Sequence, residues 1–494
     1  MVAEKADSEI EMIEKPQIEK NSLEISDDES DTTTQWKLII VAEVLSALND
    51  VETSAIEVGE WPYMKEIDEQ ATAQFYGLAT SSAKGAHAIF AIVFSIWSYK
   101  IGSVRAPLLT SRIIAIIACL IYLSVEYVGD GKRYLMMSVY ILLGVSNSAC
   151  TVLRGYITAC SSSKDRPRAF AVMGLSAIVS MSVGPVFQLL FSSITYPGYE
   201  LVSGIRFHIY SAPVVFAFLL TIVTFMIIAV FLKDVKRETS EQDLTDSKCE
   251  TQNFSIQSFR SAIKQLRRLK LDWKLIGVCL FVQIAITFSY GVDSISAILF
   301  MVQYGWTGAE TVQIGSILMV AFGIISCSVL LLYIFAKLGE RIPQEKLFLM
   351  CTMASGLVCV VTYPYTFSSS PVAEYNASTH SGCNPKEYYW CDTAYAVNPL
   401  FSMTISVLIT APTIPMMHTA LDTVYSQILG NIDQSIAQGA MTVVLDIASM
   451  LSPILNTTIF TMLGVGPLWI ITFFVFLAIA FVWAANMKNI KKYL

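Results

Sequence analysis

The segment Lys37–Val58 carries acidic and hydroxyl side chains along one face of an otherwise apolar helix. Five polar residues recur there at spacings of three and four: Glu43, Ser46, Asp50, Thr53 and Glu57. These spacings place them on one face of an α-helix, and Glu52 flanks that face. Asp50 lies about 20 Å along the segment by helical rise. Because charged groups are costly in lipid, we predict that this helix lines a cavity, with Glu43, Asp50 and Glu52 as candidate pathway residues.

A second charged group lies in the segment Phe75–Tyr99. Lys84 is about 13 Å from one end of that segment by helical rise, and His87 follows one turn later. A buried ammonium needs a carboxylate nearby, so we predict an ion pair between Lys84 and Asp50 near the middle of the membrane. Asp446, in the segment Ala437–Met462, is similarly deep. These residues either take part in transport or only fix the packing of the helices, and a histidine such as His87, taken alone, is more often a polar core residue.

Other charged residues lie closer to the ends of apolar segments. We expect Arg112, Glu126 and Asp422 to reach the membrane surface with their side chains. Arg154 and Asp293 are further pathway candidates, and Asp293 could close a gate with a basic residue on another helix. Acidic groups outnumber basic ones among all these candidates, which favours groups that bind and release protons.

The composition shows what kind of protein positions these side chains. The chain has 494 residues, of which 54% are hydrophobic and 15% charged, and its mean hydropathy is +0.56. A soluble protein carries about a quarter charged residues, so an ordinary soluble enzyme is excluded. Twelve apolar segments are long enough to span a membrane. They are Lys37–Val58, Phe75–Tyr99, Ala106–Tyr127, Tyr134–Tyr156, Ala169–Phe191, Ile209–Leu232, Leu275–Val302, Val312–Ala336, Leu347–Phe367, Pro399–Val424, Ala437–Met462 and Pro467–Ala485.

The segments fall into two sets of six, so we predict an all-α membrane protein with two six-helix halves. Residues 37–232 form one half and residues 275–485 the other, with a basic central loop at 233–274 between them. Residues 1–36 are expected to be a disordered acidic tail, and residues 486–494 a second tail. Both tails are predicted to be cytoplasmic, because that topology puts 25 Lys and Arg on the cytoplasmic side and five on the other.

Paired motifs in the two halves indicate a weak internal repeat. Gly184 and Pro185 lie in the fifth segment, and Ser452 and Pro453 lie in the eleventh, six segments later. Proline deletes a backbone hydrogen bond and glycine allows close packing, so we expect kinks and close helix contacts at both places.

One long polar loop, residues 368–396, lies on the side opposite the tails. It contains the glycosylation sequon Asn376-Ala-Ser378, and Cys383 and Cys391 are close enough in sequence to form a disulfide in an oxidising compartment. No motif in the chain indicates a cofactor, a metal site, a nucleic-acid partner or an enzyme.

An ordered set of short motifs resembles one family of membrane proteins. The chain is similar to the lysosomal major facilitator superfamily proteins whose loss causes a late-infantile form of neuronal ceroid lipofuscinosis in humans. The motifs are Trp61-Pro-Tyr-Met-Lys-Glu-Ile-Asp68, Phe75-Tyr-Gly77, Val152-Leu-Arg154-Gly-Tyr156, Gly184-Pro-Val-Phe-Gln188, Tyr304-Gly-Trp-Thr307, Gly339-Glu-Arg341, Gly382-Cys383, Trp390-Cys391 and Tyr425-Ser-Gln-Ile-Leu-Gly430. The resemblance implies twelve helices, an endolysosomal membrane, and a transport or channel activity for which chloride conduction is one proposal.

These observations favour an endolysosomal transporter that moves a small solute or ion by alternating access and is linked to protons. Two alternatives stay open. The first is an anion channel or uniporter on the same fold. The second is a membrane sensor or scaffold that does not transport. The substrate, the direction of transport and the oligomeric state are not specified by the sequence.

Overall fold

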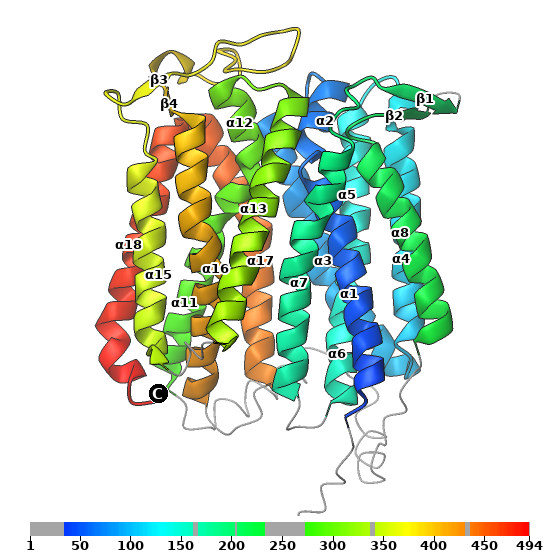
Figure 1. The fold of residues 1–494 in the computed structure, drawn as a ribbon, viewed down its shortest axis with the longest axis vertical. Helices are drawn as coiled ribbons and strands as arrows, with labels where there is room; N and C mark the ends of the chain where they lie inside the picture. The colour runs from blue at the N-terminus through cyan, green and yellow to red at the C-terminus, as the bar shows by residue number, and fades with distance from the viewer. Residues whose placement is uncertain are drawn as a thin grey trace, which may run out of the picture.

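The computed structural model describes residues 34–161, 166–202, 205–232, 272–335, 341–429 and 435–493. The expectations for the acidic tail up to residue 33, for most of the central loop, and for the motifs around residues 339 and 430 lie outside these residues. Two groups of helices lie side by side: those before residue 232 in one group and those after residue 272 in the other (Figure 1). The described chain is mostly helical, as predicted.

The described residues of the first half form eight α-helices, one 3₁₀ turn and a short hairpin. Their bounds are α1 Trp36–Glu57, α2 Glu60–Ile67, α3 Ala73–Ile101, α4 Arg105–Ser124, η1 Val125–Tyr127, α5 Lys132–Ser148, α6 Cys150–Cys160, α7 Arg166–Leu190, β1 Tyr199–Val202, β2 Ile205–Phe207 and α8 Ala212–Phe231. The strands β1 and β2 pair antiparallel. The short helix α2 was not predicted from the sequence, where this stretch follows the end of the first apolar segment.

The second half has the same general plan. Its elements are α11 Trp273–Tyr290, η2 Gly291–Ile295, α12 Ser296–Tyr304, α13 Gly308–Phe335, α15 Gln344–Val361, β3 Ser369–Pro371, η3 Cys391–Thr393, β4 Tyr395–Val397, α16 Pro399–Leu429, α17 Ser435–Leu463 and α18 Val465–Ile490. The strands β3 and β4 pair antiparallel at the two ends of the long polar loop.

Eleven helical segments within the described residues are long and apolar enough to span a membrane. The exception among the twelve predicted segments is α1. It has 22 residues, but it carries Glu43, Asp50, Glu52 and Glu57. Since α1 packs mainly on α7, α8 and α6, protein surrounds much of this charged helix. The charges therefore lie inside the bundle, as the polar stripe predicts.

Two predicted continuous segments are broken in the structure. The fourth divides into α5 and α6 at Ala149, and the seventh divides into α11 and α12 at η2. Ser148 Oγ donates to the Val145 carbonyl at 2.6 Å, and Ser294 Oγ donates to the Gly291 carbonyl at 2.6 Å. Such short-range bonds compete with the regular helix ladder, which a hydropathy pattern does not report.

Several helix ends follow from local sequence. Asp272 caps α11 by accepting a hydrogen bond from the Leu275 amide at 3.3 Å. Thr307 and Glu310 form a reciprocal capping pair at the start of α13: the Thr307 amide donates to Glu310 Oε2 at 2.9 Å, and the Glu310 amide donates to Thr307 Oγ1 at 3.3 Å. Gly305, with φ of +66°, ends α12 in the left-handed conformation that favours glycine.

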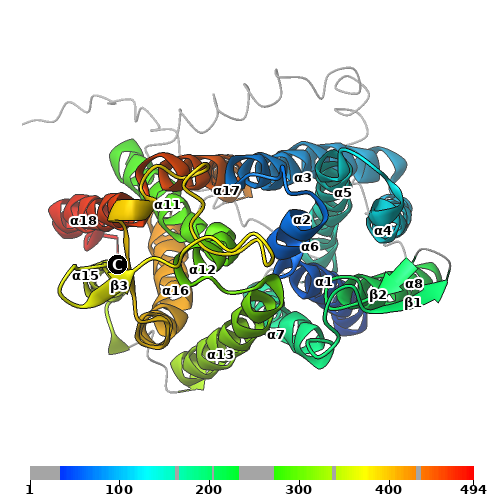
Figure 2. The same cartoon turned by 90° about the horizontal axis from the view of Figure 1, so that it is seen from above.

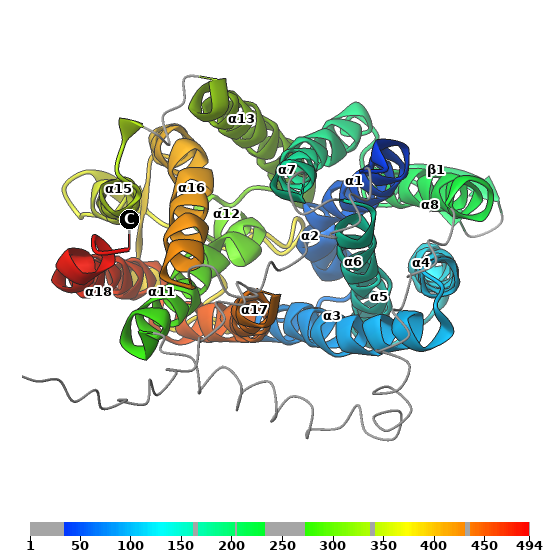
Figure 3. The same ribbon diagram turned by 90° about the horizontal axis from the view of Figure 1, so that it is seen from below.

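The two halves meet chiefly through two helix pairs, α3 with α17 and α7 with α13, and the short α2 also contacts α12 and α13. Both pairs lie side by side when the molecule is seen from above (Figure 2) and from below (Figure 3). Glycine makes each contact close. A Cβ on Gly77 of α3 would collide with the side chain of Thr457 on α17, and a Cβ on Gly323 of α13 would collide with the side chain of Ser182 on α7. Small residues therefore set the distance between the halves.

Within each half, a hydroxyl side chain packs against a glycine of a neighbouring helix. Ser54 of α1 contacts Gly184 of α7 and donates to the Ser180 carbonyl at 3.2 Å. In the other half, Ser452 of α17 contacts Gly291 and donates to the Thr287 carbonyl at 3.4 Å. The close packing predicted at the paired motifs is therefore present, and α7 and α17 continue as helices through Pro185 and Pro453.

Hydrophobic packing distinguishes the two ends of the bundle. We call the end with the long polar loop the disulfide face, and the end near Thr34 and Tyr493 the terminal face (Figure 1). At the disulfide face one core cluster contains residues from both halves, including Trp61, Leu299 and Phe460. The other two clusters each contain residues of a single half. The halves are therefore packed together chiefly at the disulfide face.

A candidate transport cavity between the halves

A cavity of about 620 Å³ lies between the two halves. Its wall includes residues of α1, α3 and α5 from the first half and of α12, α13 and α17 from the second. This volume is within the range of small-molecule sites in proteins. The polar face of α1 reaches the cavity only through its last turns, at Glu52, Thr53 and Glu57.

Three carboxylates meet at the end of the cavity near the disulfide face. They are Glu57 at the end of α1, Glu60 at the start of α2, and Asp293 in η2 of the other half. Glu57 lies within electrostatic range of both other acids. Tyr76 Oη donates to Glu60 Oε2 at 3.5 Å. Burial, followed by the charge of Glu57, raises the pKa of Glu60 from 4.5 to about 8.

A second cluster of titratable residues lies further along α3, away from the disulfide face. Lys84 and His87 of α3 and Asp446 of α17 all line the cavity and lie within electrostatic range of one another. The close packing of α3 on α17 brings these residues together. Lys84, His87 and Asp446 were all predicted from the sequence as pathway residues, and the structure places all three at the cavity wall.

The predicted ion pair between Asp50 and Lys84 is wrong. Both residues are described, and no salt bridge within 4.0 Å joins them among the pairs formed by described residues. Only the short α2 separates α1 from α3 in sequence, but α1 packs mainly on α6, α7 and α8 whereas α3 packs mainly on α5 and α17. Lys84 therefore has Glu60 and Asp446 nearby, and Asp50 has Arg154 nearby.

The remaining predicted residues lie between the cavity and the terminal face. Arg154 of α6 is within electrostatic range of Asp50 and Asp446, and so it connects the two halves. Glu43 lies two turns before Asp50 on α1. It is 5% exposed, and neither of its carboxylate oxygens has a hydrogen-bond partner within the described part of the chain. The side chains of Arg154, Asp50 and Glu43 do not line the cavity itself.

Together the titratable residues form a continuous series along the contact between the halves. Each lies within electrostatic range of the next. In order from the disulfide face they are Asp293, Glu57, Glu60, Lys84, His87, Asp446, Arg154, Asp50 and Glu43.

Glu52 forms a buried ion pair with Arg112. Arg112 Nη1 donates to Glu52 Oε2 at 2.8 Å, and Arg112 Nη2 donates to Asn49 Oδ1 at 2.5 Å and to Ser146 Oγ at 3.2 Å. Arg112 is 2% exposed, so the expectation that it reaches the membrane surface is wrong. The network connects α1, α4 and α5 because the guanidinium offers several donors in one plane.

Glu126 also differs from expectation. Its carboxylate accepts hydrogen bonds from Tyr63 Oη at 3.4 Å and pairs with His208 Nε2 at 3.1 Å, and its side chain is 12% exposed. It therefore binds α2 and the segment before α8 at the disulfide face. Asp422, the third residue expected at the surface, is exposed and does not line the cavity.

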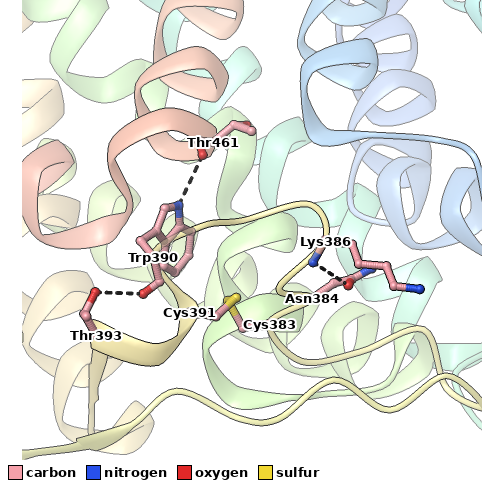
Figure 4. Close-up of a disulfide and its surroundings, with 7 residues drawn as sticks. All are labelled: Cys383, Asn384, Lys386, Trp390, Cys391, Thr393 and Thr461. Carbon is pink, nitrogen blue, oxygen red and sulfur yellow. Dashed lines mark hydrogen bonds between the residues drawn. A yellow bond between two sulfur atoms is a disulfide. The ribbon is translucent and has the colours of Figure 1, made fainter.

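The long polar loop lies at the disulfide face and contacts helices of both halves. Cys383 and Cys391 form the predicted disulfide, and Trp390 Nε1 donates to the Thr461 carbonyl of α17 at 3.2 Å (Figure 4). Between the two cysteines, Glu387 forms a salt bridge of 3.0 Å with Lys65 of α2 in the other half. Asn376 is exposed in this loop, where a sugar could be attached.

Two features of the site were not predicted from the sequence. Glu60 lies three residues after Glu57, so extending the polar stripe by one more turn would have found it. Lys65 is 5% exposed and also donates to the carbonyls of Ala71 at 3.0 Å and Glu69 at 3.2 Å. Nothing in the sequence indicates its partner Glu387, which lies 322 residues away.

Comparison with known proteins agrees with this architecture. Residues 46–383 match the model of the Major Facilitator Superfamily. The chain is 24% identical over 465 residues to Major facilitator superfamily domain-containing protein 8 of Xenopus laevis, and the match covers 89% of each chain.

Solved transporter structures share the fold at low sequence identity. A D-xylose–proton symporter has a TM-score of 0.62 and 11% identity, with 91% of this chain and 98% of that chain covered. The xylose transporter XylE of E. coli in an inward open conformation has a TM-score of 0.59 and 11% identity, covering 91% and 95%. The nucleoside transporter NupG has a TM-score of 0.55 and 14% identity, covering 91% and 99%. Because the family model matches more than half of the sequence, the chain belongs to the Major Facilitator Superfamily.

Proposed function

We propose that this protein moves a small solute across an endolysosomal membrane by alternating access and that the movement is linked to protons. The observation that carries the proposal is the charged cavity between the two halves. Its wall contains acidic residues from both halves, including Glu57 and Asp293. A solute bound there contacts both halves at once, as a site at the interface of two repeats does in transporters that rock around their substrate.

The contacts between the halves support alternation. At the disulfide face the salt bridge between Lys65 and Glu387 and a shared hydrophobic cluster hold the halves together. The corresponding clusters elsewhere stay within one half. In this state the halves are joined at the disulfide face, and rocking about the α3–α17 and α7–α13 contacts would separate them there.

The series of titratable residues supports proton linkage. The series runs from Asp293 to Glu43, and each member lies within electrostatic range of the next. Carboxylates, a histidine and a lysine placed in sequence along a membrane protein are typical of proton relays. Asp446 lies in the middle of this series, so we expect Asp446→Asn to abolish pH-driven solute movement.

An endolysosomal location is supported by the sequence resemblance and by the polar loop. The loop contains a disulfide and an exposed sequon at Asn376, both of which suit the lumen of a secretory or endolysosomal compartment.

Distances between spin labels in lipid nanodiscs test alternating access. One pair, Tyr199→Cys with Phe367→Cys, reports on the disulfide face, and the other, Ile101→Cys with Tyr493→Cys, reports on the terminal face. All four side chains are exposed. Each pair is placed in a background that keeps only the cysteines of the disulfide. Lowering the pH should lengthen one distance and shorten the other. If neither distance changes across pH while ions cross the membrane, a channel on the same fold is the better explanation.

A further inference from the structure

At the end of the cavity near the disulfide face, two carboxylates have no basic side chain paired with them among the described residues. Glu57 and Asp293 are both exposed within the cavity wall, and each is within electrostatic range of the other. Neither forms a salt bridge with any described residue. By contrast, Glu52 has Arg112 at 2.8 Å. Two facing carboxylates without a cation repel each other, and a positively charged ligand between them would remove that repulsion.

The rest of the wall suits an organic body rather than a metal ion. Aromatic side chains from the second half line it, including Phe300, Tyr304, Phe322 and Trp469. Aromatic faces bind apolar groups and attract cations. Among the described residues no group of three or more His, Cys, Asp or Glu side chains is arranged to hold a metal. A volume of about 620 Å³ also exceeds what a bare ion needs.

We infer that the cavity binds an organic amine in its protonated form, with the ammonium group between Glu57 and Asp293 and the apolar body against the aromatic wall. This inference rests on the proposed transport function, because it names the solute class of the same cavity. Lys84 lies within electrostatic range of Asp446 and Glu60, but among the described residues it forms no salt bridge with Glu57 or Asp293, which leaves this pair of carboxylates available.

Because of where the two carboxylates lie, a bound amine would also strengthen the contact between the two halves. Glu57 belongs to the first half and Asp293 to the second. An ammonium group that contacts both stabilises the arrangement in which the halves approach at the disulfide face. A neutral solute of the same shape makes no such connection.

Binding to the purified full chain tests the inference. The probe is 2-phenylethylamine, with 2-phenylethanol and 3-phenylpropionate as neutral and anionic counterparts of similar size. Isothermal titration calorimetry in nanodiscs should detect binding of the amine only. Asp293→Asn and Glu57→Gln should each raise its Kd by about tenfold or more, the range expected when a charged hydrogen-bond partner is lost.

Asp422→Asn is the matched control, since it makes the same chemical change in the second half outside the cavity. It should leave the Kd unchanged. Equal binding of the alcohol, or amine binding that survives both Asp293→Asn and Glu57→Gln, would overturn the inference. Competition by sodium or potassium chloride at matched ionic strength would also overturn it, in favour of an inorganic cation site.

The spin-label distances separate this inference from the proposed function. If the distances change with pH but the amine does not bind, only the solute class is wrong. If the amine binds while both distances stay fixed, the amine site stands and alternating access fails.

Discussion

Gly184 of α7 lies directly against the backbone of Ser54 on α1, where a Cβ atom on the glycine would be 2.7 Å from the Ser54 carbonyl carbon. Backbone atoms cannot rotate away as a side chain can. The contact therefore fixes how closely α7 approaches the helix that carries the acidic stripe, and through it the position of Glu57 at the cavity.

We predict that Gly184→Ala destabilises the protein by about 1–3 kcal/mol, the usual cost of overpacking a close contact. Gly174→Ala in the same helix is the control, because nothing lies within 4 Å of its added methyl group. There the helix propensity of alanine dominates, so stability should be unchanged or slightly higher. Thermal unfolding of both variants in detergent measures the difference. Equal melting temperatures of the two variants would show that α1 and α7 can move apart to accommodate the methyl group without loss of stability.

Removing the buried guanidinium should be more damaging. Arg112→Met leaves the Glu52 carboxylate without its ion pair and should lower stability by about 3–5 kcal/mol. The double change Arg112→Met with Glu52→Gln removes the unpaired charge and should recover most of that loss. Lys100→Met, at an exposed position, should have little effect. If the double variant is no more stable than Arg112→Met alone, the packing of the arginine matters rather than its charge.

Stability should depend on pH through Glu60. Its pKa in the folded protein is about 8, against 4.5 for an ordinary glutamate, so between these values the folded chain holds a proton that the unfolded chain has lost. This contribution is complete below pH 4.5 and is lost as the pH rises through 8. Melting temperatures of Glu60→Gln should therefore depend less on pH in this window. Glu69→Gln, whose carboxylate is exposed, should follow the unchanged protein.

Lys65 should control the closed state of the disulfide face. We expect Lys65→Met to lengthen the distance between labels at residues 199 and 367 relative to the unchanged protein. Exchanging the charges, Lys65→Glu with Glu387→Lys, should not restore the closed state. The lysine also donates to the carbonyls of Glu69 and Ala71, and a glutamate has no proton to donate there. Full recovery in the exchanged variant would show that charge attraction alone closes this face.

Glycosylation of Asn376 is testable independently of transport. Digestion with a glycosidase should change the electrophoretic mobility of the unchanged protein but not of Asn376→Gln. Asn456, in another sequon of the chain, is 0% exposed and donates to the Phe288 carbonyl at 3.2 Å, so it should not be modified. Identical mobility of the unchanged protein before and after digestion would mean that residue 376 carries no sugar.

Periodicity and depth predicted much of the site. The stripe on α1 and the depths of Lys84 and Asp446 depend only on local sequence, because helical rise and spacing fix them. The pairing of Asp50 with Lys84 failed because adjacency in sequence does not determine which helices touch. Arg112 was misplaced for the same reason: its partners Glu52 and Asn49 lie on another helix, and only the folded bundle brings them within 2.8 Å and 2.5 Å.

The ring closed by Cys383 and Cys391 has a consequence for cleavage by proteases. It contains Lys386, an exposed site for an enzyme that cuts after basic residues. A single cut there leaves both new ends joined through the disulfide, with Trp390 still anchored to α17. A nicked molecule would therefore migrate as one chain until it is reduced. In a degradative compartment, such a ring allows the long polar loop to survive a cut that would detach an open loop.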